Sequence, residues 1–203
     1  MSSCIRISLC VIFVIILCVG CSNPKRTITH LPKDAIILAF GDSLTYGMGK
    51  MPQESFPTEL ARLSGYEVVN AGVPGEITEE ALQRLPNLMK KYSPLLVILC
   101  HGGNDMLRHI STEKIQSNLE SMIETIQSYG AKVILVGIPR LGLSIKTAPL
   151  YYRIAKSKRI PFEQKIIAEV LSTPSLKSDY IHPNEKGYKK IAEALMRLLP
   201  ERI

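Results

Sequence analysis

The sequence predicts an α/β domain with a mostly parallel central sheet and helices on both faces. Short, unbroken apolar runs alternate along the chain with longer segments whose apolar residues recur at helical spacing. Unbroken runs are typical of strands buried on both faces, and strand–helix alternation implies right-handed βαβ crossovers. The chain has 203 residues, 46% of them hydrophobic, so it can bury one substantial core and we expect one folded domain.

Four short segments predict the strands: residues 36–40, 67–71, 95–100 and 132–138. The first and third are unbroken apolar runs, whereas the second and fourth contain charged residues. The third run is the most apolar and ends in Cys100. A free cysteine in such a place behaves as a small hydrophobic residue, so we expect Cys100 to be buried and not to act as a nucleophile.

Five amphipathic segments predict the helices. They are residues 55–64, 78–92, 112–129, 162–171 and 184–199. The second contains Pro86, which is expected to kink or divide it. Gly130 stops the third.

The N-terminus is predicted to be a targeting segment. Arg6 precedes an apolar stretch, residues 7–19, which has the length of a signal peptide and is short for a membrane span. The stretch ends in Gly20-Cys21, which resembles a bacterial lipobox, with Cys18 where that motif usually has Leu. We therefore expect residues 1–21 to be a lipoprotein-type signal peptide, with Cys21 as the lipid attachment site.

Residues 22–33 then read as a linker and residues 34–203 as the folded domain. Ordinary signal cleavage nearby and an uncleaved anchor are the alternatives to lipidation at Cys21. All three place the domain outside the cytoplasm, facing the periplasm or at the cell surface. Four of the five cysteines lie in the first 21 residues, so a disulfide framework within the domain is excluded.

The charge distribution argues against nucleic acid as a partner. The formal net charge is +7, but the basic residues are scattered along amphipathic segments such as residues 186–197. No run of five or six like charges and no recognition motif accompanies the excess. We expect no nucleic-acid binding.

Ser43 is the candidate nucleophile. It stands in Gly41-Asp42-Ser43-Leu44, at the transition from the first predicted strand to a helix. A serine hydroxyl is a poor nucleophile until a base removes its proton as attack occurs. The pattern differs from the Gly-x-Ser-x-Gly elbow of α/β-hydrolases. An ordinary turn is the alternative reading of this segment.

His182 is the candidate base, and Asp179, three residues earlier, is the carboxylate that can orient it. An unperturbed imidazole has a pKa of about 6.5, so it can accept and return a proton near neutrality. The alternative is a helix-capping turn in which His182 is merely polar. His101 is a further candidate for the pocket lining, and no histidine pair shows the ligand spacing of a zinc site.

Gly72 and Asn104 are the candidate oxyanion donors, through a backbone N–H and a side-chain amide respectively. Like Ser43, each follows a predicted strand by a few residues. Parallel strands end at one edge of the sheet, where ligands of such folds sit, so the sequence predicts a shared site. The alternative is that both are turn residues, as Asn and Gly often are.

These residues match a known family. From about residue 36 to residue 199 the chain resembles the SGNH (GDSL-type) hydrolases, through Gly41-Asp42-Ser43-Leu44, Asn70-Ala71-Gly72, Gly102-Gly103-Asn104-Asp105 and Asp179-Tyr180-Ile181-His182. The resemblance implies a flavodoxin-like three-layer α/β/α sandwich with a mostly parallel central sheet, and no metal or organic cofactor. It also implies a short final strand before Asp179, although residues 172–178 show no strand pattern.

The same resemblance implies a serine esterase with a Ser43–His182–Asp179 triad. It is most similar to the bacterial arylesterases, thioesterases and lysophospholipases. We expect a small-molecule ester as substrate and a membrane anchor through Cys21. Residues 139–160 are apolar in part and are expected to overhang the pocket, and the alternative for them is an ordinary surface loop. An envelope carbohydrate O-deacetylase or O-acyltransferase and a catalytically silent binding lipoprotein are the alternative functions.

Overall fold

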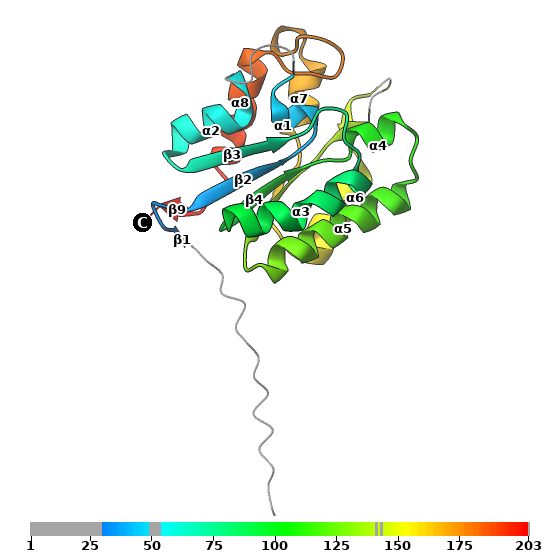
Figure 1. Ribbon diagram of the computed structural model, residues 1–203. Helices are drawn as coiled ribbons and strands as arrows, with labels where there is room; N and C mark the ends of the chain where they lie inside the picture. The colour runs from blue at the N-terminus through cyan, green and yellow to red at the C-terminus, as the bar shows by residue number, and fades with distance from the viewer. Residues whose placement is uncertain (1–29, 49–53, 141, 143, 203) are drawn as a thin grey trace, which may run out of the picture.

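A five-stranded parallel sheet forms the centre of the computed structural model, which describes residues 30–48, 54–140, 142 and 144–202 (Figure 1). Its spatial order is β3-β2-β4-β5-β8, and every neighbouring pair is parallel. The strands are β2 (Ile36–Gly41), β3 (Glu67–Gly72), β4 (Leu96–Cys100), β5 (Lys132–Val136) and β8 (Phe162–Glu163). In order of appearance this is the flavodoxin-like 2-1-3-4-5 arrangement, which confirms the predicted fold class.

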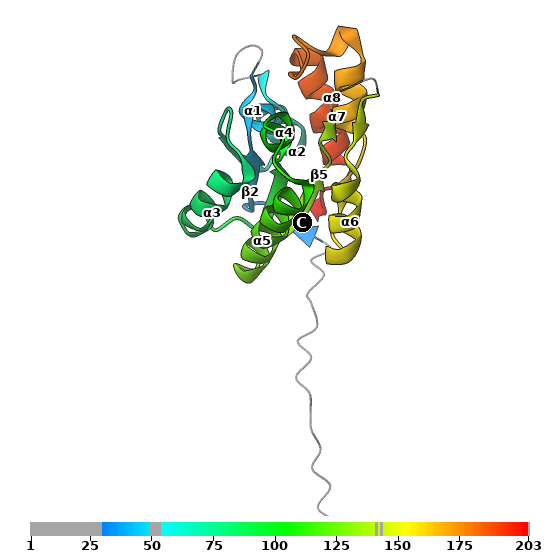
Figure 2. The same cartoon turned by 90° about the vertical axis from the view of Figure 1, so that its right-hand side faces the viewer.

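Helices cover both faces of the sheet. On one face α2 (Phe56–Ser64) packs against α8 (Glu185–Met196). On the other lie α3 (Thr78–Tyr92), α5 (Thr112–Ser128) and α6 (Pro149–Lys158), which Figure 2 shows as a row. The result is the expected three-layer sandwich.

The two central strands carry the core. All five residues of β4 and five of the six in β2 are buried. Edge strand β3 has no buried residue, since its side chains are exposed or partly exposed. The apolar runs of the sequence therefore mark the strands covered on both faces, as expected from their lack of alternation. Cys100 is fully buried at the end of β4, as predicted.

The structure corrects the start of one predicted helix and excludes one of two expectations for another. The segment 162–171 was expected to be helical throughout, but Phe162–Glu163 pairs with β5 as strand β8. The helix, α7 (Ile166–Ser172), begins later because the Glu163 carboxylate accepts the backbone N–H groups of Lys165 and Ile166 at 3.0 and 3.1 Å. Of the two effects expected of Pro86, a kink or a division, the division does not occur, since α3 runs without a break from Thr78 to Tyr92.

The segment 139–160 is mostly not an overhanging loop. It forms a two-residue hairpin, β6 (Pro139–Arg140) with β7 (Lys146–Thr147), and then helix α6. Leu150, Tyr151 and Ile154 of α6 are buried in the core, whereas Tyr152 is 43% exposed. Two of the residues expected over the pocket, at positions 141 and 143, lie outside the described residues.

The ends of the described chain meet at the edge of the sheet where β2 begins. Strand β1 (His30–Leu31), at the end of the segment expected to be a linker, pairs with β9 (Glu201–Arg202). Leu31 is fully buried there. Within the part of the chain that the structure describes, no helix has the length and apolar character to cross a membrane. The predicted signal segment and Cys21 lie outside that part.

Candidate active site

Ser43 is the first residue of the short helix α1 (Ser43–Tyr46), directly after β2. Asp42 caps this helix: its carboxylate accepts the Leu44 N–H at 3.1 Å. The preceding residue must be a glycine, because a Cβ at Gly41 would overlap the Cys100 carbonyl oxygen. The sharp strand-to-helix turn that presents Ser43 thus depends on close contact between β2 and β4.

His182 and Asp179 complete a hydrogen-bonded line with Ser43. The His182 Nε2 atom lies 3.1 Å from Ser43 Oγ, and its Nδ1 atom lies 2.9 Å from Asp179 Oδ2. With Asp179 accepting at Nδ1, the imidazole carries its proton there and offers Nε2 as an acceptor for the serine hydroxyl. This is the geometry of a nucleophile, a base and an orienting carboxylate.

A tight loop fixes the position of Asp179 relative to His182. The second carboxylate oxygen of Asp179 accepts the N–H groups of Ile181 and His182, both at 2.8 Å. An antiparallel bridge between Lys177 and Pro183 closes the loop. The segment before it contains a 3₁₀ turn, Pro174–Leu176, and no strand, in agreement with its lack of a strand pattern.

Asn184 joins this loop to α8. Its side-chain oxygen caps the helix by accepting the Gly187 N–H at 3.1 Å. Its amide donates in turn to the carbonyl oxygens of Ser175 and Lys177. One residue therefore ties the helix start to the loop that carries the base.

The pKa values of the two carboxyl groups near Ser43, those of Asp42 and Asp179, are shifted in opposite directions. Burial raises the pKa of the Asp42 carboxyl, which is 2% exposed. Partial burial also raises the pKa of Asp179, but hydrogen bonds from the Ile181 N–H and from His182 outweigh it, and the net pKa lies below its usual value. Asp179 is therefore the carboxylate that stays ionised beside an imidazole.

Asn104 lies at the same edge of the sheet, in helix α4 (Gly103–Leu107), after β4. Its side-chain Nδ2 donates to the Glu76 carbonyl oxygen at 3.0 Å. The turn into α4 uses Gly102 at φ +108°, a conformation that favours glycine. Since Ser43 follows β2 and Asn104 follows β4, the two flank the point where the strand order reverses, the usual ligand site of such sheets.

Gly72 ends β3, beside Gly41 of β2. A Cβ there would overlap the backbone of Tyr46, so this glycine allows α1 to pack against β3. Its N–H already donates to Asn70 Oδ1 at 3.0 Å, and a substrate oxygen could use it only after Asn70 releases it.

A second glycine in the same loop was not singled out from the sequence. Gly75 has φ +78°, with nothing within 4 Å of where a Cβ would lie. Within the described residues no hydrogen bond engages its N–H, while its carbonyl accepts from Arg108 at 2.9 Å. What distinguishes Gly75 in the structure is its positive φ, and a backbone angle cannot be read from one sequence.

A cavity of about 590 Å³ opens beside Ser43 and Asn104. Its walls are largely apolar side chains from α4, α5, α7, the connection between α4 and α5, the segment after β5 and the loop that carries His182: Leu107, Ile110, Ile115, Ile138, Leu171 and Ile181. Pro139 and Arg140 are the part of the expected overhang that lines it. A polar end and apolar walls suit a ligand with one reactive polar group and a hydrophobic body.

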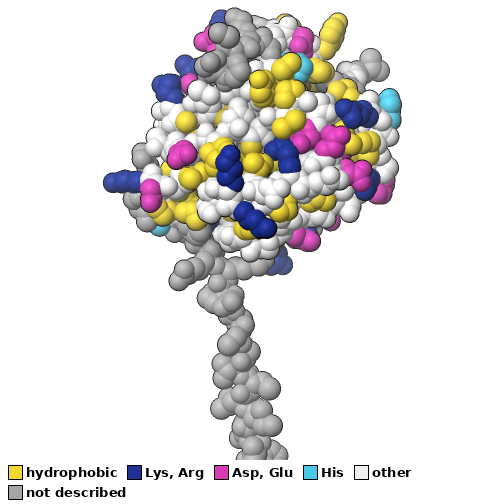
Figure 3. All heavy atoms as spheres, viewed as in Figure 1, with side chains coloured by type: hydrophobic (Ala, Val, Ile, Leu, Met, Phe, Trp, Pro, Cys, Tyr) yellow, Lys and Arg dark blue, Asp and Glu magenta, His cyan; other side chains and the backbone are white. Residues whose placement is uncertain are grey.

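His101, the further candidate for the pocket lining, is fully buried and does not line the cavity. His109, between α4 and α5, does line it. Burial raises the pKa of the Cys100 thiol, which disfavours the reactive thiolate. Among the described residues no group of three or more His, Cys, Asp or Glu side chains could hold a metal ion. On the face shown in Figure 3, basic and acidic side chains are interspersed.

Comparison with protein families gives a match over most of the chain. Residues 39–190 match the GDSL-like lipase/acylhydrolase family. Esterase TesA of Pseudomonas aeruginosa is 33% identical over 170 residues, covering 77% of this chain and 84% of the relative. The arylesterase of Vibrio mimicus is 30% identical over 168 residues, with the same two coverages.

Two further relatives and one solved structure extend the comparison. Thioesterase 1/protease 1/lysophospholipase L1 of Escherichia coli is 29% identical over 171 residues, 80% of this chain and 82% of the relative. The uncharacterized lipoprotein YqeF of Bacillus subtilis is 27% identical over 113 residues, 49% of this chain and 46% of the relative. The crystal structure of esterase EstA from Pseudoalteromonas sp., inhibited by monoethylphosphonate, superposes with a TM-score of 0.70 at 26% identity, covering 81% of this chain and 96% of that one.

Proposed function

Because the chain belongs to the GDSL-like lipase/acylhydrolase (SGNH) family, we propose that it is a serine esterase whose catalytic residues are Ser43, His182 and Asp179. The observation that carries the proposal is the continuous hydrogen-bonded line from Ser43 Oγ through His182 to the Asp179 carboxylate. A serine without such a base is not nucleophilic at neutral pH.

The reaction proceeds in two halves. Ser43 Oγ attacks the ester carbonyl carbon while His182 Nε2 takes the hydroxyl proton, and Asp179 stabilises the resulting imidazolium. The tetrahedral intermediate collapses with cleavage of the bond to the leaving oxygen, which receives the proton from His182. Water then attacks the acyl-enzyme by the same route, releases the carboxylic acid and restores the Ser43 hydroxyl.

The oxyanion is held by backbone and side-chain N–H groups. The Ser43 N–H and the Asn104 amide are two donors, and the loop after β3 supplies the third. Gly72 is the donor expected from the sequence, although its N–H is occupied by Asn70, whereas the Gly75 N–H is unoccupied among the described residues. Losing one such donor typically costs about 3 kcal/mol of transition-state stabilisation.

The substrates are esters with an apolar acyl or aryl group, and thioesters of the same kind. The apolar walls and the volume of the cavity, about 590 Å³, support this class, since pockets for small organic ligands have about 300–1,000 Å³. The printed activities of the relatives, arylesterase and thioesterase/lysophospholipase, support it as well. Lysophospholipids are the lipid esters that a membrane-tethered enzyme would meet.

The domain is tethered outside the cytoplasm. We propose that residues 1–21 are a signal peptide ending at the lipobox cysteine and cleaved on the N-terminal side of Cys21, so that Cys21 becomes the N-terminus and carries the lipid. Residues 22–33 then link it to the hydrolase domain, residues 34–203, and β1 at the end of this segment pairs with β9 of the domain. The apolar stretch that ends in Gly20-Cys21 supports this, and so does the similarity to a protein named as a lipoprotein.

Hydrolysis of a p-nitrophenyl ester series from acetate to palmitate, by the purified protein and its Ser43→Ala variant, tests the proposal. Activity that disappears in Ser43→Ala supports a serine esterase. Activity confined to acetate would instead favour the carbohydrate O-deacetylase alternative. Equal inactivity of both proteins on every ester would overturn the proposal.

A further inference from the structure

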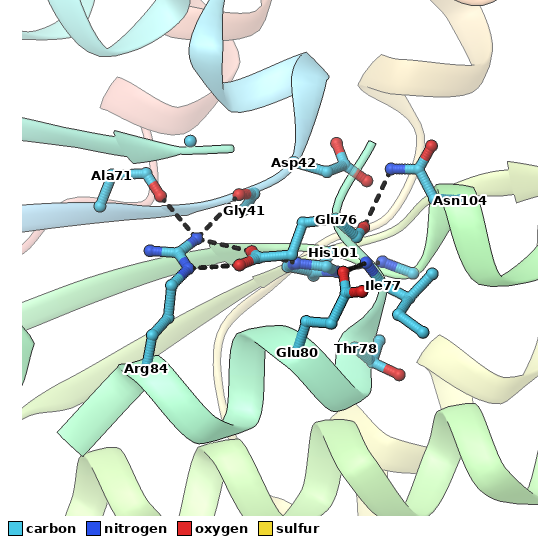
Figure 4. A network of polar contacts seen from close by, with 12 residues as sticks. Gly41, Asp42, Ala71, Glu76, Ile77, Thr78, Glu80, Arg84, His101 and Asn104 are labelled. Atoms are coloured by element: carbon cyan, nitrogen blue, oxygen red, sulfur yellow. Dashed lines mark hydrogen bonds and ion pairs between the residues drawn. The ribbon is translucent and has the colours of Figure 1, made fainter. Parts of the chain in front are cut away.

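Three charged or ionisable side chains meet behind the site: Glu76, Arg84 and His101, here called the Glu76 cluster (Figure 4). The Glu76 carboxylate accepts two hydrogen bonds from the Arg84 guanidinium, at 2.5 and 2.6 Å, and lies 3.1 Å from His101 Nε2. Glu76 is 6% exposed and His101 is fully buried. None of the three is needed for the chemistry proposed for Ser43 and His182.

The cluster touches the ends of the three strands that carry the site. Arg84 Nη2 donates to the carbonyl oxygens of Ala71, at 2.9 Å, and Gly41, at 3.3 Å, which lie at the ends of β3 and β2. Its guanidinium also lies over the Phe40 ring, 4.3 Å from the centroid. His101 directly follows β4. One guanidinium–carboxylate–imidazole unit thus fixes the spacing of the strand ends.

Glu76 also orients the amide of Asn104. The Glu76 backbone carbonyl accepts from Asn104 Nδ2 at 3.0 Å. A carbonyl oxygen can only accept a hydrogen bond, so the nitrogen of the Asn104 amide and not its oxygen must face Glu76, and this contact sets which way the amide points. Among the described residues it is the one hydrogen bond that Nδ2 makes, and the second N–H of the amide is left for a ligand. The position of the Glu76 backbone therefore decides where that N–H points.

Within the Glu76 cluster, the negative charge of the Glu76 carboxylate is offset by the positive charge of the Arg84 guanidinium. His101 Nδ1 accepts the Gly102 N–H at 3.0 Å, so the proton of the ring is on Nε2 and is donated to Glu76. Burial raises the pKa of Glu76, but the hydrogen bonds from His101 and Arg84 outweigh it and hold the pKa below its usual value. Removing the carboxylate would leave the guanidinium without its partner, which is costly in a poorly solvated site.

We propose that Glu76 is a positioning residue of the esterase: its carboxylate, clamped by Arg84 and His101, holds the loop after β3 so that its own carbonyl aims the Asn104 amide at the oxyanion. This inference rests on the proposed function. It assigns a role to a charged residue on an otherwise turn-like segment, where a solvated glutamate would be the ordinary expectation.

A double-mutant cycle tests the coupling. In Glu76→Gln we expect kcat to fall about 10- to 100-fold with KM nearly unchanged, since a misplacement of about 1 Å can cost about 100-fold. In an Asn104→Ala background the same substitution should change kcat less than about twofold, because the amide through which Glu76 acts is gone. Equal losses in both backgrounds, or a loss of thermal stability with unchanged kcat, would overturn the inference.

Two further variants distinguish a positioning effect of Glu76 from misfolding or a general effect of charge. Arg84→Lys keeps a positive charge beside Glu76 but loses the guanidinium group, whose Nη2 reaches the two strand-end carbonyl oxygens. It should therefore lower kcat as well, but less than Glu76→Gln. Glu79→Gln removes an exposed carboxylate on α3 that pairs with Lys114 of α5, and it should leave kcat unchanged. A drop in Glu79→Gln as large as that in Glu76→Gln would assign the effect to surface charge and overturn the proposal.

The Asn104 side-chain amide signal in a ¹⁵N–¹H spectrum, assigned by its loss in Asn104→Ala, gives a readout independent of activity. Glu76→Gln should shift or broaden this signal, and Glu79→Gln should not. An unchanged signal in Glu76→Gln overturns the inference even when the enzyme is active. If the wild-type protein hydrolyses no ester, the proposed function fails, and this spectrum still decides whether Glu76 positions the amide.

Discussion

His182 Nε2 lies 3.1 Å from Ser43 Oγ although 139 residues separate them in the sequence. The two residues come from opposite ends of the folded part of the chain. Ser43 begins the helix after the first strand of the central sheet, and His182 precedes the last helix, α8. That α8 packs against α2 on the same face of the sheet brings the two loops together. The site therefore forms only when the C-terminal helix docks.

Replacing either partner of this contact should nearly abolish esterase activity. We expect Ser43→Ala and His182→Ala each to lower kcat by about 10⁶-fold, and the double variant to be no worse than either single one, because the pair acts as a unit. Steady-state kinetics on p-nitrophenyl butyrate, with circular dichroism to verify folding, measure this. Losses that multiply in the double variant would contradict a shared mechanism.

Asp179→Asn should leave the loop intact and still impair catalysis. An asparagine oxygen can keep accepting the N–H groups of Ile181 and His182, but its amide nitrogen would face His182 Nδ1 and favour the wrong tautomer. We expect kcat to fall about 10⁴-fold. A kcat within a few-fold of wild type, in a folded variant, would remove Asp179 from the triad.

The Asp179 carboxylate should contribute to stability only while it is ionised. Its pKa in the folded protein is lowered below the unfolded value, so its contribution is fully present above the unfolded pKa, about 3.9. The contribution is lost as the pH falls through the lower folded pKa. Urea unfolding of wild type and Asp179→Asn between pH 2.5 and 6 checks the sign: their difference in unfolding free energy should shrink below about pH 4. A difference that grows there would reverse the assignment.

Cys21 should decide where the protein fractionates. We expect the full chain, expressed in a bacterium that processes lipoproteins, to separate with membranes and to release into the soluble fraction when Cys21→Ser is made. Cys10→Ser is the matched control, since it changes a thiol in the segment expected to be removed but outside the lipobox-like motif. Equal partition of both variants would indicate ordinary cleavage or an uncleaved anchor.

The fold was accessible from local patterns in the sequence, and the candidates Ser43, His182 and Asp179 were accessible from short motifs that resemble one family. Unbroken apolar runs identify β2 and β4, and a polar residue just after a parallel strand must lie at one edge of the sheet. Two-residue strand β8 was missed because its pairing with β5 is a long-range event that Phe162 and Glu163 do not encode locally. Helix α6 was missed although Pro149 at its first turn was a usable signal.

The Glu76 cluster could not be read from the sequence at all. Glu76 is eight residues from Arg84 and 25 from His101, and nothing in that spacing brings them together. A charged residue in a turn or on a helix face is normally solvated, which is the correct expectation for Glu79. Only the crossover that lays α3 beside β2 places Arg84 over the ends of two strands.

The shape of the cavity makes a last prediction about acyl-chain length. Leu107 lines the cavity from α4 and is 47% exposed, so a larger side chain there can be accommodated without disturbing the core. In Leu107→Trp we expect kcat/KM for decanoate esters to fall about tenfold relative to acetate, since a single methylene in an apolar pocket is worth about 1–3 kcal/mol. Met196→Trp is the matched control, on α8 and similarly exposed, and it should leave the chain-length profile unchanged. Equal profiles for the wild type and Leu107→Trp would mean that the acyl chain lies elsewhere. In that case the leaving group would occupy the cavity, and varying the alcohol of the ester should reveal the Leu107→Trp effect instead.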